Sequence, residues 1–93
     1  MITHLVMFRF NDKGDIGKVR ELLEGLEGIV PQLRSIEVGV NIVDSPRAYD
    51  MVLQTTFDSL EDLQAYQVHP THVEAATYIR SVIDASASVD YER

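Results

Sequence analysis

Tyr66, His69 and His72 lie around Pro70 in a chain of 93 residues that contains three histidines in all. A neutral imidazole accepts a proton near pH 7, and a phenol donates a hydrogen bond to a developing oxyanion. His72 could therefore remove a proton next to a carbonyl group while Tyr66 stabilises the resulting oxyanion. This segment is the strongest candidate for chemistry in the chain.

The position of Pro70 predicts how these side chains are presented. Proline has a fixed φ and no amide hydrogen, so it suits the first position of a helix. His69, which precedes it, is driven towards an extended backbone and breaks the helix that carries Tyr66. His72 then falls in the first turn of the next helix, whose positive end disfavours the imidazolium and keeps the ring neutral.

Each of these residues also has a purely structural interpretation. His72 could hydrogen-bond to a neighbouring backbone group, Tyr66 could pack as a half-buried amphipathic side chain, and His69 could serve the helix break alone. His4 lies among apolar residues of the first strand, where a hydrogen-bonded core histidine is the usual finding. The sequence leaves both interpretations open.

A metal or haem site is the second chemical option, because three histidines could gather around zinc or iron. His69 and His72 flank a proline, however, and lack the i, i+4 spacing that presents two ligands on one helix face. The chain has no cysteine, which excludes thiolate ligands, disulfides and a cysteine nucleophile. We expect neither a metal nor a cofactor.

The composition is that of an ordinary globular domain, with 45% hydrophobic and 25% charged residues. A formal charge of −7 opposes binding to phosphate backbones and anionic membranes, and no cluster of Lys or Arg offsets it. No apolar run reaches membrane-spanning length, and no signal peptide is recognised. We expect a single cytoplasmic domain over residues 1–93 that binds neither nucleic acid nor membranes.

Hydrophobic periodicity predicts the elements that must position the candidate residues. Period-two alternation indicates strands over residues 2–10, 35–43, 49–57 and 85–91, of which the second and third form an antiparallel hairpin. Helical spacing indicates helices over residues 16–30 and 60–82. The second of these is broken at 69–70, and Arg80 on its later half is expected to face water.

The order strand, helix, strand, strand, broken helix, strand predicts a ferredoxin-like α+β sandwich (βαββαβ) with helices on one face of an antiparallel four-stranded sheet. The first strand is apolar on both faces, with His4, Val6 and Phe8 on one and Leu5 and Met7 on the other. The face without helices would be an unusually large exposed apolar patch. Pairing two sheets face to face would bury it, so we expect a homodimer that forms a dimeric α/β barrel.

Several segments resemble the stress-responsive A/B barrel domain (Dabb) family, in order and over essentially the whole chain. The most specific is Tyr66-Gln67-Val68-His69-Pro70-Thr71-His72-Val73. Residues 2–10, 36–41, 48–50, 57–61 and 89–91 are also similar. The resemblance implies a dimeric barrel of two ferredoxin-like subunits, in agreement with the patterning.

The resemblance implies a pocket, whereas most members of the family have no assigned reaction. One plant member is a cofactor-free polyketide cyclase that closes a ring by aldol condensation with a tyrosine and a histidine. The resemblance places those roles on Tyr66 and His72, and a pocket histidine of the first strand on His4. Another pocket histidine of the cyclase has no counterpart, because Met51 takes its position. We predict that His4, His69 and Met51 line the pocket around Tyr66 and His72.

Two classes of function follow. In the first, the protein is a homodimer whose pocket binds a small molecule with apolar and polar parts. In the second, it is a cofactor-independent, cyclase-like enzyme with His72 as base and Tyr66 as oxyanion donor. The sequence contains no recognisable phosphate-binding loop or carboxylate pair. Glu37, Asp50 and Asp90 lie on strands and are expected to face water or the rim of the dimer.

Overall fold

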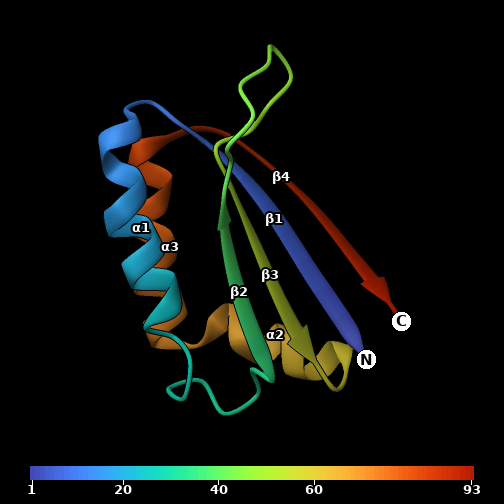
Figure 1. Cartoon of the computed structure of the whole chain (residues 1–93). Coiled ribbons are helices and arrows are strands. Elements are labelled where there is room, and N and C mark those ends of the chain that lie inside the picture. Colours follow the sequence, from blue (N-terminus) through green and yellow to red (C-terminus); the bar gives the residue numbers. More distant parts are fainter.

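The computed structural model describes residues 1–93, and its four strands form one antiparallel sheet in the order β2-β3-β1-β4. The elements are β1 (Ile2–Phe10), a 3-10 turn (Lys13–Asp15), α1 (Ile16–Glu24), β2 (Ser35–Val40), β3 (Met51–Phe57), α2 (Leu60–Val68), α3 (Pro70–Val82) and β4 (Ile83–Glu92) (Figure 1). This confirms the predicted ferredoxin-like α+β fold. The sheet contains pairings between distant parts of the chain, since β1 lies between β3 and β4.

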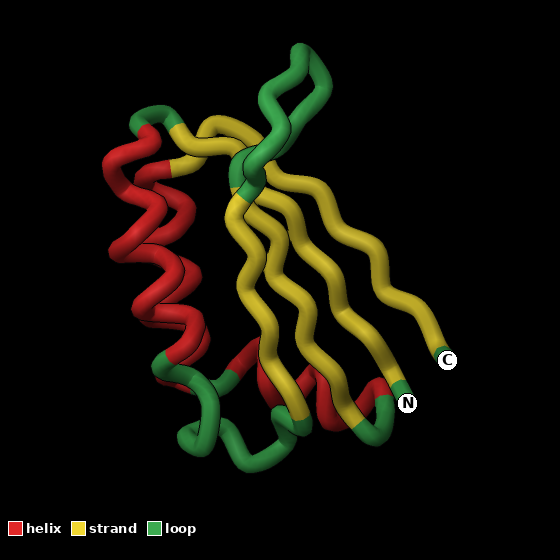
Figure 2. Tube along the Cα trace, in the orientation of Figure 1, coloured by secondary structure: helices red, strands yellow, loops and turns green.

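The helices gather on one side of the sheet, as Figure 2 shows. α1 and α3 run along it, and α2 crosses near one end of the strands. A single apolar core fills the space between the two layers and includes Phe8, Leu23, Leu53, Phe57 and Ile79. None of the helices has the length and the apolar composition needed to cross a lipid bilayer.

The other side of the sheet carries apolar side chains that no helix covers. Leu5 pairs with Val89 of β4, and Met7 pairs with Val52 of β3 and Ala87 of β4. Directly paired residues share one face of a sheet, so these five side chains lie together. Val89 is 56% exposed. We call the surface formed by Leu5, Met7, Val52, Ala87 and Val89 the open face.

The first helix is shorter than predicted and ends at Glu24. The chain continues in tight turns, in which the Leu26 N–H donates to the Leu23 carbonyl at 3.1 Å. Gly28 has a φ of +80°, a left-handed conformation that a continuing helix cannot contain. Leu26 and Val30 are nevertheless fully buried. The helical spacing therefore identified core positions beyond the true end of the helix.

The predicted hairpin of the second and third strands is present, but its connection is longer than expected. β2 ends at Val40 and β3 begins at Met51, so residues 41–50 form a loop that projects beyond the sheet (Figure 1). Ile42 is 94% exposed, so it does not share the apolar face that the alternating pattern predicted for it. Asp50 does not face water as expected, because its Oδ2 accepts a hydrogen bond from the Phe10 N–H at 2.8 Å.

Candidate functional site

The junction between α2 and α3 is built by His69 and Pro70. His69 has an extended backbone (φ −63°, ψ 133°), and Pro70 opens α3, as the sequence predicts. The His69 Nδ1 atom accepts a hydrogen bond from the Thr71 N–H at 3.2 Å. His69 is therefore the N-cap of α3 and satisfies one of the free amides at its start.

This junction brings Tyr66 and His72 together. Their ring centroids lie 4.3 Å apart, and the other side of Tyr66 packs against Phe57 at 5.0 Å. Tyr66 is fully buried, and its hydroxyl group has no hydrogen-bond partner. Burial raises the pKa of Tyr66 to about 12, so the phenol keeps its proton at neutral pH.

His72 is held in one tautomer by the end of α2. Its Nδ1 atom lies 3.1 Å from the Gln67 carbonyl oxygen, which only accepts, so Nδ1 donates and Nε2 keeps its lone pair. Burial lowers the pKa of the imidazole, the hydrogen bond to the Gln67 carbonyl opposes this shift, and the positive charge of Arg80 acts in the same direction as burial. The ring is therefore neutral at pH 7, as predicted, but burial is the main cause.

His4 is oriented by a carboxylate on the neighbouring strand. Its Nδ1 atom hydrogen-bonds to Asp90 Oδ1, its direct partner across the β1–β4 pair. The His4 side chain is largely buried, whereas that of Asp90 is 43% exposed. An ionised carboxylate accepts from Nδ1–H, which leaves Nε2 of His4 available.

His4 and His72 line the same cavity, which has a volume of about 220 Å³ and lies between the sheet and α3. Its inner walls are apolar and include Phe8, Leu53 and Ile79. Two imidazoles with free Nε2 atoms on an apolar wall can accept hydrogen bonds or protons from an enclosed ligand.

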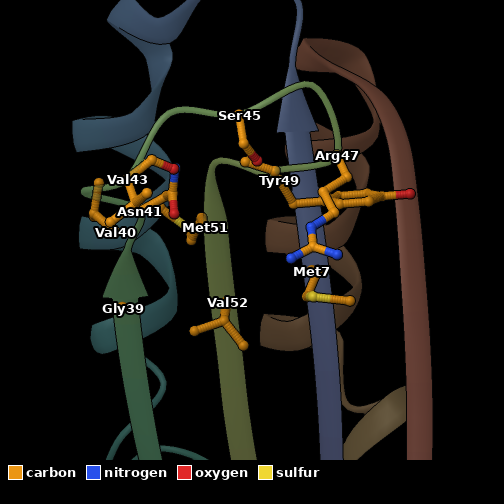
Figure 3. Close-up of a pocket in the computed structure, with 11 residues that line it drawn as sticks. Met7, Gly39, Val40, Asn41, Val43, Ser45, Arg47, Tyr49, Met51 and Val52 are labelled. Atoms are coloured by element: carbon orange, nitrogen blue, oxygen red, sulfur yellow. The ribbon is translucent and has the colours of Figure 1, made fainter.

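The other predicted pocket residues lie elsewhere. Tyr66 contacts His72 but is not part of the cavity wall, and neither is His69. Met51 lines a separate cavity of about 550 Å³ between the sheet and the 41–50 loop. Figure 3 shows this second cavity, with Arg47 reaching down towards Met7 of the open face. It contains no histidine, and we therefore take the smaller cavity as the candidate site.

Two polar residues of the candidate site were not predicted. Asp90 is exposed, as expected, but it is also the partner of His4. Arg80 is exposed, as expected, but it is also part of the cavity wall. The sequence did contain an indication for Asp90. On β4 it alternates with apolar residues and shares its side of the strand with two serines. The structure has no group of three or more His, Cys, Asp or Glu side chains that could hold a metal ion.

Comparisons with known proteins agree with this fold. Residues 2–93 match the family model described as Stress Responsive A/B Barrel Domain. The stress-response A/B barrel domain-containing protein HS1 of Arabidopsis thaliana is 28% identical, over 98% of this chain and 88% of that protein. The olivetolic acid cyclase of Cannabis sativa is 25% identical, over 97% of this chain and 94% of the cyclase.

Several similar solved structures are described as dimeric. One is a dimeric protein of unknown function with a ferredoxin-like fold from Bacteroides fragilis. It has a TM-score of 0.87 and 29% sequence identity, and the match covers 99% of this chain and 95% of that one.

Proposed function

The chain belongs to the stress-responsive A/B barrel domain family, and from this premise we propose that it is a homodimeric protein that binds a small molecule. The ligand occupies the cavity between the sheet and α3, in contact with His4 and His72. Its carbon skeleton packs on the apolar walls, and a polar group meets the two imidazoles.

The observation that carries this proposal is the way both imidazoles are fixed. Each has its Nδ1 atom bound to an acceptor of the protein, His4 to Asp90 and His72 to the Gln67 carbonyl. The tautomer and the direction of each ring are thereby set before any ligand arrives. A core histidine can form a hydrogen bond of this kind as well, but these two rings line one cavity and neither Nε2 atom has a hydrogen-bond partner in the protein.

The homodimer is proposed to form through the open face. An apolar surface without a covering element marks an interaction site, and a twofold axis would place each open face on its copy. The dimeric solved structures of similar fold support this assembly. The larger cavity beside the 41–50 loop includes Met7 and Val52 of the same face, so a partner subunit would cover its mouth.

Ligand binding is tested with a substitution that fills the cavity. Ala76 belongs to its wall, whereas Thr77, the next residue of α3, is exposed. Wild-type protein, Ala76→Leu and Thr77→Leu are screened by thermal shift against a panel of small ketones and carboxylic acids. A ligand at about 100 times its Kd adds about 2.7 kcal/mol to stability, a shift of several degrees in Tm.

We expect the compounds that raise the Tm of wild type to raise that of Thr77→Leu equally and that of Ala76→Leu much less. Equal shifts in all three proteins would place the ligand outside the cavity and contradict the proposal. Because both substitutions introduce leucine on the same helix, general effects of added apolar bulk appear in the control as well.

A second candidate function is a cofactor-independent cyclisation, which the similarity to olivetolic acid cyclase supports. Nε2 of neutral His72 would take a proton from a carbon next to a carbonyl group. The electron pair would move to the carbonyl oxygen as an enolate, whose carbon then attacks a second carbonyl of the same molecule. The proton would return from His72 to the new alkoxide.

Tyr66 is the expected oxyanion donor in this scheme, and its hydroxyl group is free of other partners. Because Tyr66 is fully buried and is not part of the cavity wall, this role requires its side chain to move. His4 lines the cavity directly and offers a second donor when it is protonated. On any substrate found in the screen, His72→Ala should abolish turnover. Loss of turnover in His4→Gln but not in Tyr66→Phe would assign the donor role to His4, and full turnover of His72→Ala would remove the candidate.

A further inference from the structure

Arg80 is a cation of the cavity wall that has no acidic partner in the chain. Arg9, Arg20 and Arg34 all pair with carboxylates, at N–O distances of 3.1, 3.4 and 2.5 Å. Arg80 forms no such pair, although the chain has fifteen acidic residues against eight basic ones. A free guanidinium at a cavity, in so acidic a protein, has a fork of donors available for a ligand.

The cavity changes from apolar to polar along its length. Leu23, Leu53 and Ile79 are each no more than 5% exposed and form its inner part. Arg80 and Ser86 belong to the same wall but are exposed to solvent, so they lie at its mouth. A ligand that matches this gradient has an apolar body and one polar end.

The charges of the residues around the cavity decide whether the polar end of the ligand is positive, negative or neutral. His4, His72 and Arg80 all line this one cavity, so their charges act on the same space. His72 is neutral at pH 7 and brings no charge of its own, and the Asp90 carboxylate is already bound to His4. The charge of Arg80 at the mouth is therefore left uncompensated by the protein.

We infer that the cavity is selective for small monocarboxylates, with the carboxylate on Arg80 at the mouth and the carbon skeleton on the apolar walls. This inference rests on the proposed ligand-binding function and specifies its ligand class. A carboxylate matches the planar guanidinium with two parallel hydrogen bonds, which a neutral amide of the same shape cannot do. The cavity volume of about 220 Å³ limits the ligand to a small skeleton.

The chain provides a matched control in Arg47. It is also exposed, also lacks a carboxylate partner, and lines the larger cavity beside the 41–50 loop. Replacing either arginine by glutamine removes one positive charge from the protein. Only Arg80→Gln removes it from the cavity that contains His4 and His72.

Benzoate and benzamide are suitable probes, because they share one skeleton and differ in charge. Their Kd values are measured by calorimetry at constant ionic strength for wild type, Arg80→Gln, Arg80→Lys and Arg47→Gln. The ring signals of His4 and His72 in NMR spectra report whether the probe enters the cavity. We expect wild type to bind benzoate at least about tenfold more tightly than benzamide, the size of one charge-assisted hydrogen bond.

The preference should disappear in Arg80→Gln, return in part in Arg80→Lys and persist in Arg47→Gln. Equal binding of both probes to wild type would overturn the monocarboxylate inference while leaving the ligand-binding function in place. If neither probe moves the histidine signals, the result would contradict both the monocarboxylate inference and the ligand-binding function. Loss of the preference in Arg47→Gln alone would place the anion in the other cavity and overturn the inference.

Discussion

His72 and His4 are fixed by different acceptors, and the difference decides what each ring can do. The Gln67 carbonyl accepts a hydrogen bond from His72, and the burial of this ring opposes its protonation. The Asp90 carboxylate holds His4 and fixes the direction of its Nε2 atom. In any proton transfer within the cavity, His72 therefore acts first as a base, and His4 is an oriented hydrogen-bonding group.

The protonation of His72 predicts a pH dependence of stability. Its pKa in the folded protein is below the reference value of 6.5, so the unfolded chain binds the proton more readily. The contribution of the neutral ring to the free energy of unfolding is fully present above the reference pKa, and it is lost as pH falls through the pKa of the folded protein. One proton contributes a slope of at most about 1.4 kcal/mol per pH unit.

Urea unfolding from pH 8 to pH 5 measures this slope for wild type and His72→Gln, whose side chain does not titrate. The difference between the two free energies of unfolding should be constant above pH 7 and should shift against wild type at lower pH. Parallel curves over the whole range would show that burial does not disfavour the charged ring.

Residue types alone predicted part of this site. Tyr66 and His72 could be paired because they lie on either side of one proline break, so local backbone rules sufficed. His4 and Asp90 are 86 positions apart, and their contact depends on the register between β1 and β4. Arg80 belongs to a helix face whose rotation towards the cavity is set by packing. Neither feature is encoded by a local pattern.

At the scale of elements, the junction of α2 and α3 is the feature that positions the site. His69 caps α3 through Thr71, and this geometry directs His72 back towards Gln67 at the end of α2. The sequence predicted the break itself, because a residue before proline avoids the helical region. It did not distinguish a capping role of His69 from a pocket role, since an imidazole nitrogen can accept a hydrogen bond in either.

The capping role of His69 predicts the effect of two substitutions. His69→Ala removes the acceptor for the Thr71 N–H and should lower the free energy of unfolding by about 1 kcal/mol. His69→Asn restores a good N-cap and should return most of that stability. Both values come from urea unfolding at pH 7.

Ligand affinity separates this role from a direct one. We expect His69→Asn to bind cavity ligands as wild type does, because His69 is not part of the cavity wall. A large loss of affinity in a fully stable His69→Asn protein would instead return His69 to the binding site.

The ends of α1 and β2 mark the limit of periodicity as a guide to elements. Leu26 and Val30 keep helical spacing after the helix has ended, because turns also bring apolar residues into the core. Ile42 keeps strand spacing but is almost fully exposed in the loop after β2. Spacing reports which side chains are apolar, and tertiary packing decides the conformation that places them.

For the whole molecule, the open face is the surface through which we propose that the protein assembles. Its apolar side chains come from β1, β3 and β4, and the pattern of β1 alone indicated that a second apolar surface exists. β4 adds to this surface, since Val89 is on the same side as Leu5. The sequence could predict that a second surface must cover the open face, but it could not predict which residues would meet there.

Leu5→Lys should dissociate the dimer, because a twofold interface would bury two uncompensated charges that cost several kcal/mol each. The control is Val73→Lys, which changes an exposed valine of α3 away from the open face. Analytical ultracentrifugation at micromolar concentration should find wild type and Val73→Lys dimeric and Leu5→Lys monomeric. A dimeric Leu5→Lys protein would place the interface on another surface.

The central position of β1 has a consequence for how the protein is made. β1 is synthesised before β4 and yet needs β4 at its side, since Ile2 pairs with Glu92. Until β4 has been made, the edge of β1 that receives it has no partner and is open to pairing with other nascent chains. Closure of so long a loop also favours slow folding.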